Sequence, residues 1–299
     1  MVTDAAQLPA WLRAIYPFAT KQFTTPSGAA MSFVDEGPRG EEAVLMLHGN
    51  PTWSFFYRDV IRELSPSIRC IAPDHIGMGL SEKPENYDYT LSTRIADVEA
   101  LVASLGLKKV HLIVHDWGGA IGCGFATRHP EMINRMVILN TAAFFSVHIP
   151  RRIALCRAGI LGKFVVRALN GFAGPASWMS TVRPLLTDVK RGFLFPYDSW
   201  TNRVAVHRFV KDIPMEVSHP TRSVLEKIES DLPLLAEKEK LILWGGEDFC
   251  FNDHFLARWR EIFPQAPVHR YRDAGHYVLE DAGDDIRQRI NRFLLPKTP

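Results

Sequence analysis

The sequence predicts an α/β fold: a mostly parallel central sheet flanked by helices, with an inserted helical cap. Three observations support this prediction. Short apolar runs show little internal alternation, as expected of strands that are buried on both faces. Helical patterns separate these runs, which is typical of a parallel sheet with crossover helices. Residues 140–240, late in the sheet, contain several helical patches but no clear strand.

The expected elements follow in chain order. Strands are predicted at 43–47, 68–72, 110–114, 135–139, 241–244 and 268–272. Helices are predicted where apolar residues are spaced three and four apart, at 54–64, 91–105, directly after Asp116, at 253–262 and at 284–295. We expect an α/β core at 1–140 and 231–299 and a helical cap at 141–230. Such a cap would lie over the carboxyl ends of the strands, where open α/β sheets bind ligands.

Composition and charge exclude several functions. The formal charge of +2 gives no reason to expect a nucleic-acid partner. No apolar run is long enough to span a membrane, and the first residues lack the pattern of a signal peptide. The chain has four cysteines, Cys70, Cys123, Cys156 and Cys250. Their spacing is not that of a metal site. We therefore expect a cytoplasmic protein with no metal and no cofactor.

The stretch VHDWGG places Asp116 between a predicted strand and a predicted helix. Gly118 and Gly119 would let the helix approach the sheet closely, as in a nucleophile elbow. Two features depart from the usual elbow, because Asp replaces Ser and Val114 stands where the first Gly is usual. Asp116 is thus a candidate nucleophile, although an aspartate here could also serve only as a helix cap.

Two later residues complete a candidate catalytic triad in the order nucleophile, acid, histidine. Asp248 follows the predicted strand 241–244, and His276 lies in a glycine-containing loop after the last predicted strand. His276 would act as the base, and Asp248 would orient it and stabilise its charged form. Glu247 is a competing acid, whereas Asn140, after the strand 135–139, cannot carry the charge.

The loop HGNP after the first predicted core strand supplies hydrogen-bond donors. Asn50 has a side-chain amide and Trp117 has an indole N–H, and together they could stabilise negative charge on a leaving group. Trp117 could instead be only a packing contact of the cap. His48 and His115 are expected to be structural, bonding neighbouring loops.

A carboxylate nucleophile restricts the substrate. Attack of Asp116 on an acyl carbon would form a labile anhydride, but displacement at an alkyl carbon leaves an ordinary ester. We therefore expect a substrate with an electrophilic sp³ carbon, which means an alkyl halide, an epoxide or a strained lactone.

These motifs resemble the haloalkane dehalogenase branch of the α/β-hydrolase superfamily over essentially the whole chain. The segments that match are HGNPTW (48–53), PDHIGMGLS (73–81), VHDWGG (114–119) and DAGHYVLED (273–281). By this resemblance Asn50 and Trp117 correspond to the halide-stabilising pair. An acid at Asp248, together with Asn50, matches the third subfamily of that branch.

Within that subfamily the sequence is most similar to the OleB-type β-lactone decarboxylases of bacterial olefin synthesis. The similar segments are NTAAF (140–144), ASWM (176–179), FPYDSWTNR (195–203), FVKDIP (209–214) and DFCFNDHFL (248–256). The resemblance implies that Asp116 opens a cis-β-lactone, which then loses carbon dioxide to give a long-chain cis-alkene. It also implies association with other olefin-biosynthesis enzymes. Decarboxylation leaves the role of His276 open, because elimination needs no water.

Other functions remain as alternatives. Haloalkane dehalogenase is the nearest, and epoxide hydrolase is the second, although the latter uses two cap tyrosines and residues 141–215 contain only Tyr197. Fluoroacetate dehalogenases carry an arginine at the place of Trp117. The basic and apolar segment 149–170 could contact a membrane surface or a partner enzyme, or could simply be a solvated cap helix. A receptor that uses the fold only for binding is a third class, against which the intact triad argues.

Overall fold

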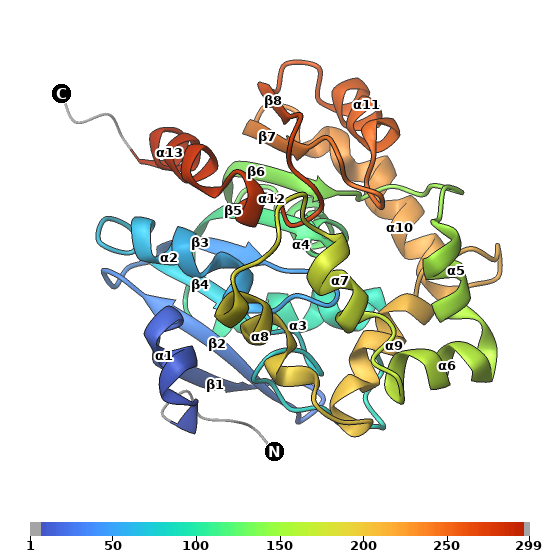
Figure 1. Cartoon of the computed structure of the whole chain (residues 1–299). Helices are drawn as coiled ribbons and strands as arrows, with labels where there is room; N and C mark the ends of the chain where they lie inside the picture. Colours follow the sequence, from blue (N-terminus) through green and yellow to red (C-terminus); the bar gives the residue numbers. More distant parts are fainter. Residues whose placement is uncertain (1–6, 296–299) are drawn as a thin grey trace.

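The computed structural model describes residues 7–295, and its centre is an eight-stranded sheet in the order β1-β2-β4-β3-β5-β6-β7-β8 (Figure 1). The strands are β1 (Thr20–Thr24), β2 (Ala30–Glu36), β3 (Glu42–Leu47), β4 (Cys70–Pro73), β5 (Lys109–Asp116), β6 (Ile133–Thr141), β7 (Glu239–Gly245) and β8 (Val268–Tyr271). All pairs from β4 to β8 are parallel, whereas β1–β2 and β2–β4 are antiparallel. The predicted α/β architecture is thereby confirmed.

Side chains alternate between two cores, one on each face of the sheet. In β3, Ala43, Leu45 and Leu47 belong to one core, while Val44 and Met46 belong to the other. Every one of these side chains is fully buried. Strands of this kind are apolar on both faces, which explains why the sequence shows continuous apolar runs there.

Helices cover both faces of the sheet. They are α1 (Ala10–Ile15), α2 (Arg58–Leu64), α3 (Leu91–Ser104), α4 (Trp117–Arg128), α11 (Asp253–Ile262), α12 (Val278–Asp281) and α13 (Gly283–Leu294). Helices α3 and α4 pack together on one side, and α2 packs against α13 on the other. The predicted helix 54–64 begins as a 3₁₀ turn at Ser54–Tyr57 and becomes α-helical only from Arg58.

Between β6 and β7 the structure contains helices and, in this described part of the chain, no strand. These helices are α5 (Arg151–Arg157), α6 (Gly159–Arg167), α7 (Ala173–Met179), α8 (Thr187–Leu194), α9 (Val204–Lys211) and α10 (Pro220–Asp231). Figure 1 shows α5, α6, α7 and α9 grouped at one side of the sheet. Helix α10 packs against α3 and α4. The limits 141–230 of a separate cap domain therefore stay a prediction.

Two details of the prediction need correction. Strands β1 and β2 were not predicted, because β1 is short and largely exposed and polar residues interrupt the apolar run of β2. The segment 149–170 is also two helices rather than one, because the chain bends at Gly159, whose φ of +43° is the left-handed conformation that glycine tolerates best. Among residues 7–295, no helix combines the length and apolar character that crossing a bilayer requires.

Candidate active site

Asp116 lies at a strained turn between β5 and α4. Its φ and ψ are 52° and −127°, a conformation that a non-glycine residue rarely adopts. A Cβ at Gly118 would come within 1.9 Å of the Leu47 carbonyl oxygen, and one at Gly119 within 1.8 Å of Thr141 Oγ1. The two glycines are therefore required by close packing. The Asp116 carboxylate makes no capping hydrogen bond to α4, so its position is not explained by helix capping.

The two oxygens of the Asp116 carboxylate have different surroundings. Oδ1 accepts a hydrogen bond of 2.7 Å from the backbone N–H of Asn50. A Cβ at position 49 would lie 2.0 Å from the same oxygen, so that only the glycine present, Gly49, fits there. Oδ2 lies 3.7 Å from His276 Nε2, which is longer than a hydrogen bond. Oδ2 is thus the oxygen that is free to react.

The structure brings Asp248 and His276 together behind Asp116. His276 Nδ1 donates to Asp248 Oδ2 at 2.8 Å, and both side chains are buried. The other oxygen of Asp248 accepts from the backbone N–H groups of Cys250 and Phe251 at 2.7 and 3.0 Å. Glu247, the competing acid, is exposed. Asp248 therefore fixes the tautomer of His276 in which Nε2 faces Asp116.

The buried charges of the site influence one another. Burial raises the pKa of Asp116 above its usual 3.8, and the positive charge of His276 and the N–H of Asn50 only partly oppose this effect. Burial also disfavours the charged form of His276, but Asp248 and then Asp116 outweigh it and hold the pKa of His276 above 6.5. His276 and the two carboxyl groups thus influence one another, because the charge of His276 favours the ionised form of Asp116, while Asp248 and Asp116 favour the charged form of His276.

The neighbouring histidines hold loops in place, as expected. His48 Nε2 accepts from the His75 N–H at 3.1 Å, and burial lowers the pKa of His48 to about 4. His115 Nε2 donates to the His276 carbonyl oxygen at 2.9 Å, and burial lowers the pKa of His115 as well. Both rings remain neutral near pH 7 and serve as hydrogen-bonding braces of the site.

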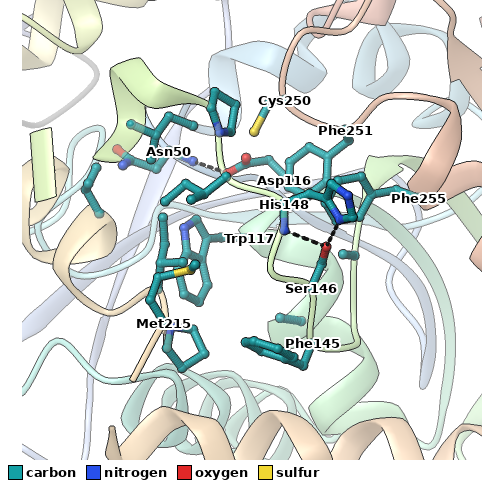
Figure 2. Close-up of a pocket in the computed structure, with 18 of the residues that line it drawn as sticks. Asn50, Asp116, Trp117, Phe145, Ser146, His148, Met215, Cys250, Phe251 and Phe255 are labelled. Carbon is teal, nitrogen blue, oxygen red and sulfur yellow. Dashed lines mark hydrogen bonds between the residues drawn. The ribbon is translucent and has the colours of Figure 1, made fainter. Parts of the chain in front are cut away.

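Asn50 and Trp117 both border a cavity in front of Asp116 (Figure 2). The side-chain amide of Asn50 donates to the Val206 carbonyl oxygen of α9 at 3.1 Å, and its Oδ1 is buried without a partner. The sequence did not predict this contact, because it depends on where α9 lies. Trp117 packs edge-on against Phe209, at 5.7 Å between ring centroids. Asn50 therefore bonds Asp116 through its backbone N–H, whereas its side-chain amide bonds Val206.

Apolar side chains of the cap complete the cavity. Figure 2 shows Phe145 and Met215 at the opposite end from Asn50 and Asp116. These lining residues were not predicted, because no sequence motif distinguishes an apolar residue that lines a cavity from one that packs in the cap. Within residues 7–295 no group of three or more His, Cys, Asp or Glu side chains could hold a metal ion. The polar groups at the site are the Asp116 carboxylate, the His276 imidazole and the N–H donors of Asn50 and Trp117.

Comparison with known proteins agrees with this geometry. Residues 42–283 match the model of the α/β hydrolase fold family. The chain belongs to the α/β-hydrolase family. This α/β hydrolase is 43% identical over 290 residues to the cis-3-alkyl-4-alkyloxetan-2-one decarboxylase of Shewanella oneidensis, covering 95% of this chain and 90% of the relative. It is also 43% identical to the decarboxylase of the same name from Xanthomonas campestris pv. campestris, covering 93% and 97%.

More distant relatives are dehalogenases. The α/β hydrolase is 30% identical to haloalkane dehalogenase 2 of Mycobacterium tuberculosis, covering 92% of this chain and 95% of the relative. Among solved structures, an ancestral haloalkane dehalogenase has the same fold, with a TM-score of 0.82, 24% identity and coverage of 91% and 97%. The resemblance inferred from the motifs is therefore confirmed at the level of the family.

Proposed function

We propose that this α/β hydrolase is a β-lactone decarboxylase that converts a cis-3,4-dialkyl-oxetan-2-one into a cis-alkene and carbon dioxide. The observation that carries the proposal is the 43% identity, over nearly the whole of both chains, to two proteins named for this reaction. The geometry supports it, because Asp116 presents a carboxylate to an apolar cavity. A carboxylate suits attack on the sp³ ring carbon of such a lactone.

The first step is displacement at the ring carbon that bears the ring oxygen. Asp116 Oδ2 forms a bond to this carbon as the bond to the ring oxygen breaks, and the electron pair goes to the new carboxylate. An alkyl ester of Asp116 results. The backbone N–H of Asn50 keeps Oδ1 in place, so that Oδ2 is the attacking atom. Trp117 borders the same cavity, and its indole N–H would stabilise the departing carboxylate.

The second step restores the enzyme. The bond between the neighbouring carbon and the carboxylate breaks, its electron pair forms the double bond, and Asp116 leaves as a carboxylate while carbon dioxide is released. No water and no net proton transfer are needed. Inversion in the first step followed by anti elimination in the second gives the cis-alkene from the cis-lactone, so the stereochemistry is consistent with a covalent intermediate.

His276 and Asp248 have an electrostatic role in this scheme. The imidazole lies 3.7 Å from Asp116 Oδ2, and its charged form would compensate the carboxylate when Asp116 is released. Asp248 orients the ring through the 2.8 Å hydrogen bond to Nδ1. The pair stabilises the ionised form of Asp116, which burial alone would disfavour.

Haloalkane dehalogenation is the second candidate, favoured by the 30% identity to named dehalogenases. In that reaction His276 would take a proton from a water molecule that hydrolyses the alkyl ester. Epoxide hydrolysis is less well supported. The only tyrosine of residues 141–215, Tyr197, is buried, and its hydroxyl bonds the Thr52 carbonyl oxygen and Met78 Sδ. It is therefore not free to protonate an epoxide oxygen.

The test compares two substrates on the purified protein. A long-chain cis-β-lactone is assayed for alkene by gas chromatography, and 1-bromohexane is assayed for bromide release. Alkene formation with little bromide supports the decarboxylase. Rapid bromide release with an inert lactone would show a dehalogenase instead. Asp116→Ala must abolish whichever activity is found, and an active variant would overturn Asp116 as the nucleophile.

We also propose that the cap contacts another enzyme of olefin biosynthesis in the cytoplasm. Among the described residues, 11 of the 13 exposed large apolar side chains lie between 147 and 217, including Ile160 and Leu161 on α6. Such a concentration is typical of a contact surface. All four cysteines are free thiols, which fits a reducing compartment. Sedimentation with a purified β-lactone synthetase tests the contact, and Ile160→Glu should weaken it.

A further inference from the structure

Two separate cavities meet at Asp116. They share five lining residues, which are Asn50, Asp116, Ile153, Phe172 and Cys250. Their cavity volumes are about 130 and 420 Å³. The nucleophile therefore lies at a junction, with one cavity on each side, rather than at the closed end of a single pocket.

Each cavity has its own apolar lining beyond the junction. The cavity in Figure 2, here named arm A, is lined by Phe144, Phe145, Ile213, Met215, Leu225 and Phe255. The other, here named arm B, is lined by Leu155, Val165, Ala176, Trp178, Met179 and Phe249. Apart from the five shared residues the two linings have no member in common.

Helix α5 lies between the arms. Pro150, just before the helix, borders arm A, and Leu155, near its end, borders arm B. Ile153 faces both arms and is buried. Beyond the shared residues, helix α5 therefore stands between the two arms and contributes different side chains to each.

The reactive groups are also distributed around the junction. Trp117 borders arm A only, and His276 borders arm B only. In arm A the other polar side chains, Ser146 and His148, lie at the surface and bond each other at 3.3 Å. In arm B the charged side chain is the exposed Arg152. Polar chemistry is thus concentrated near Asp116, and both arms offer mainly apolar surface.

We propose that the two arms hold the two alkyl chains of one β-lactone molecule, one chain in each arm. This inference rests on the proposed function, because the proposed substrate bears alkyl groups on two adjacent ring carbons, so that two chains lead away from the reacting centre. A substrate with one chain would fill one arm and leave the other without apolar contact. The length accepted at each ring carbon is set by the residues of one arm alone.

The test uses two lactones in which a long and a short alkyl chain exchange places on the ring. One has a long chain on the carbon next to the carbonyl and a short chain on the carbon next to the ring oxygen, and the other has them reversed. Ile213→Phe narrows arm A, and Ala176→Leu narrows arm B. We expect each variant to discriminate against a different lactone, by about tenfold or more in kcat/KM, which is the usual effect of excluding a methylene from an apolar site.

Matched controls and opposite changes guard against general damage to the fold. Ile160→Phe and Ala154→Leu make the same substitutions at exposed positions and should leave the preference between the two lactones unchanged. Met215→Ala widens arm A, and Trp178→Ala widens arm B. Each widening variant should prefer the lactone that is rejected when the same arm is narrowed.

Binding separates this inference from the proposed function. Asp116→Asn carrying each arm variant is titrated with the two lactones, and the shift in Tm reports binding without turnover. Opposite preferences of the two narrowing variants support the two arms, whether or not the unmodified enzyme forms alkene. Absence of alkene formation by the unmodified enzyme would overturn only the proposed function. Rejection of the same lactone by both variants, or no preference in either, would show a single channel and overturn the inference.

Discussion

The side chain of Asn140 bonds the backbone of Gly245 in both directions. Asn140 Nδ2 donates to the Gly245 carbonyl oxygen at 2.9 Å, and the Gly245 N–H donates to Asn140 Oδ1 at 2.8 Å. This fully buried amide joins the ends of β6 and β7. Because the loop that carries Asp248 starts at Gly245, Asn140 fixes the start of the loop that places Asp248, the proposed acid.

Asn140→Asp should make stability depend on pH. Protonated aspartic acid can still donate and accept at Gly245, whereas the ionised form loses its donor and leaves a buried charge. The folded state therefore holds the proton more tightly than the unfolded state, and the variant loses stability as pH rises above about 4. Denaturation between pH 4 and 8 measures this loss, with Asn134→Asp at the exposed start of β6 as control. Equal behaviour of the two variants would contradict the prediction.

Asp116→Asn should stabilise the protein while removing activity. Burial raises the pKa of Asp116, so the folded state favours the protonated form. Ionisation of Asp116 therefore lowers the free energy of unfolding as pH rises from the pKa of the unfolded state through that of the folded state. A neutral amide keeps the acceptor for Asn50 without this cost. We expect a higher Tm at pH 7 and at least about a thousandfold loss of alkene formation. Asp188→Asn, at an exposed position, is the control, and a lower Tm for Asp116→Asn would contradict the argument.

His276→Phe should separate the two candidate reactions. Decarboxylation needs no water, so the variant should still form alkene, at a rate reduced by the loss of the positive charge beside Asp116. With 1-bromohexane the hexyl ester of Asp116 should persist, because no base activates water. Intact-protein mass spectrometry detects this ester, and His269→Phe serves as control. Complete loss of alkene without any ester would mean that His276 is required for the decarboxylation itself.

Trp117→Phe should lower kcat with little change in KM. The substitution keeps the aromatic contact with Phe209 but removes the indole N–H that would stabilise the departing carboxylate. Loss of one such donor usually costs about 10²–10³ in kcat. Trp200→Phe, outside both arms, should have no effect. Normal kcat in Trp117→Phe would reduce Trp117 to a packing contact of the cap.

The sequence was informative where local pattern and structure coincide. Strands β3 to β7 are mostly buried, so their apolar runs identify them. Asp116, Asp248 and His276 lie at or after the carboxyl ends of strands that meet at one edge of the sheet. Strand β1 was missed because it is a short edge strand with mostly exposed residues, and β2 was missed because polar residues interrupt its apolar run. The contact of Asn50 with Val206 and the division into two arms depend on how α5 and α9 pack, and no local pattern encodes that packing.

The separation of the arms by α5 has a consequence for how this enzyme can change. Because each arm has a lining of its own, a substitution such as Ala176→Leu alters one side of the substrate without remodelling the other. Chain-length preference at the two ring carbons can then diverge independently among descendants of one ancestor. For the protein engineer, two small mutant libraries, one for each arm, replace a single large combinatorial one, and the best members of each can be combined.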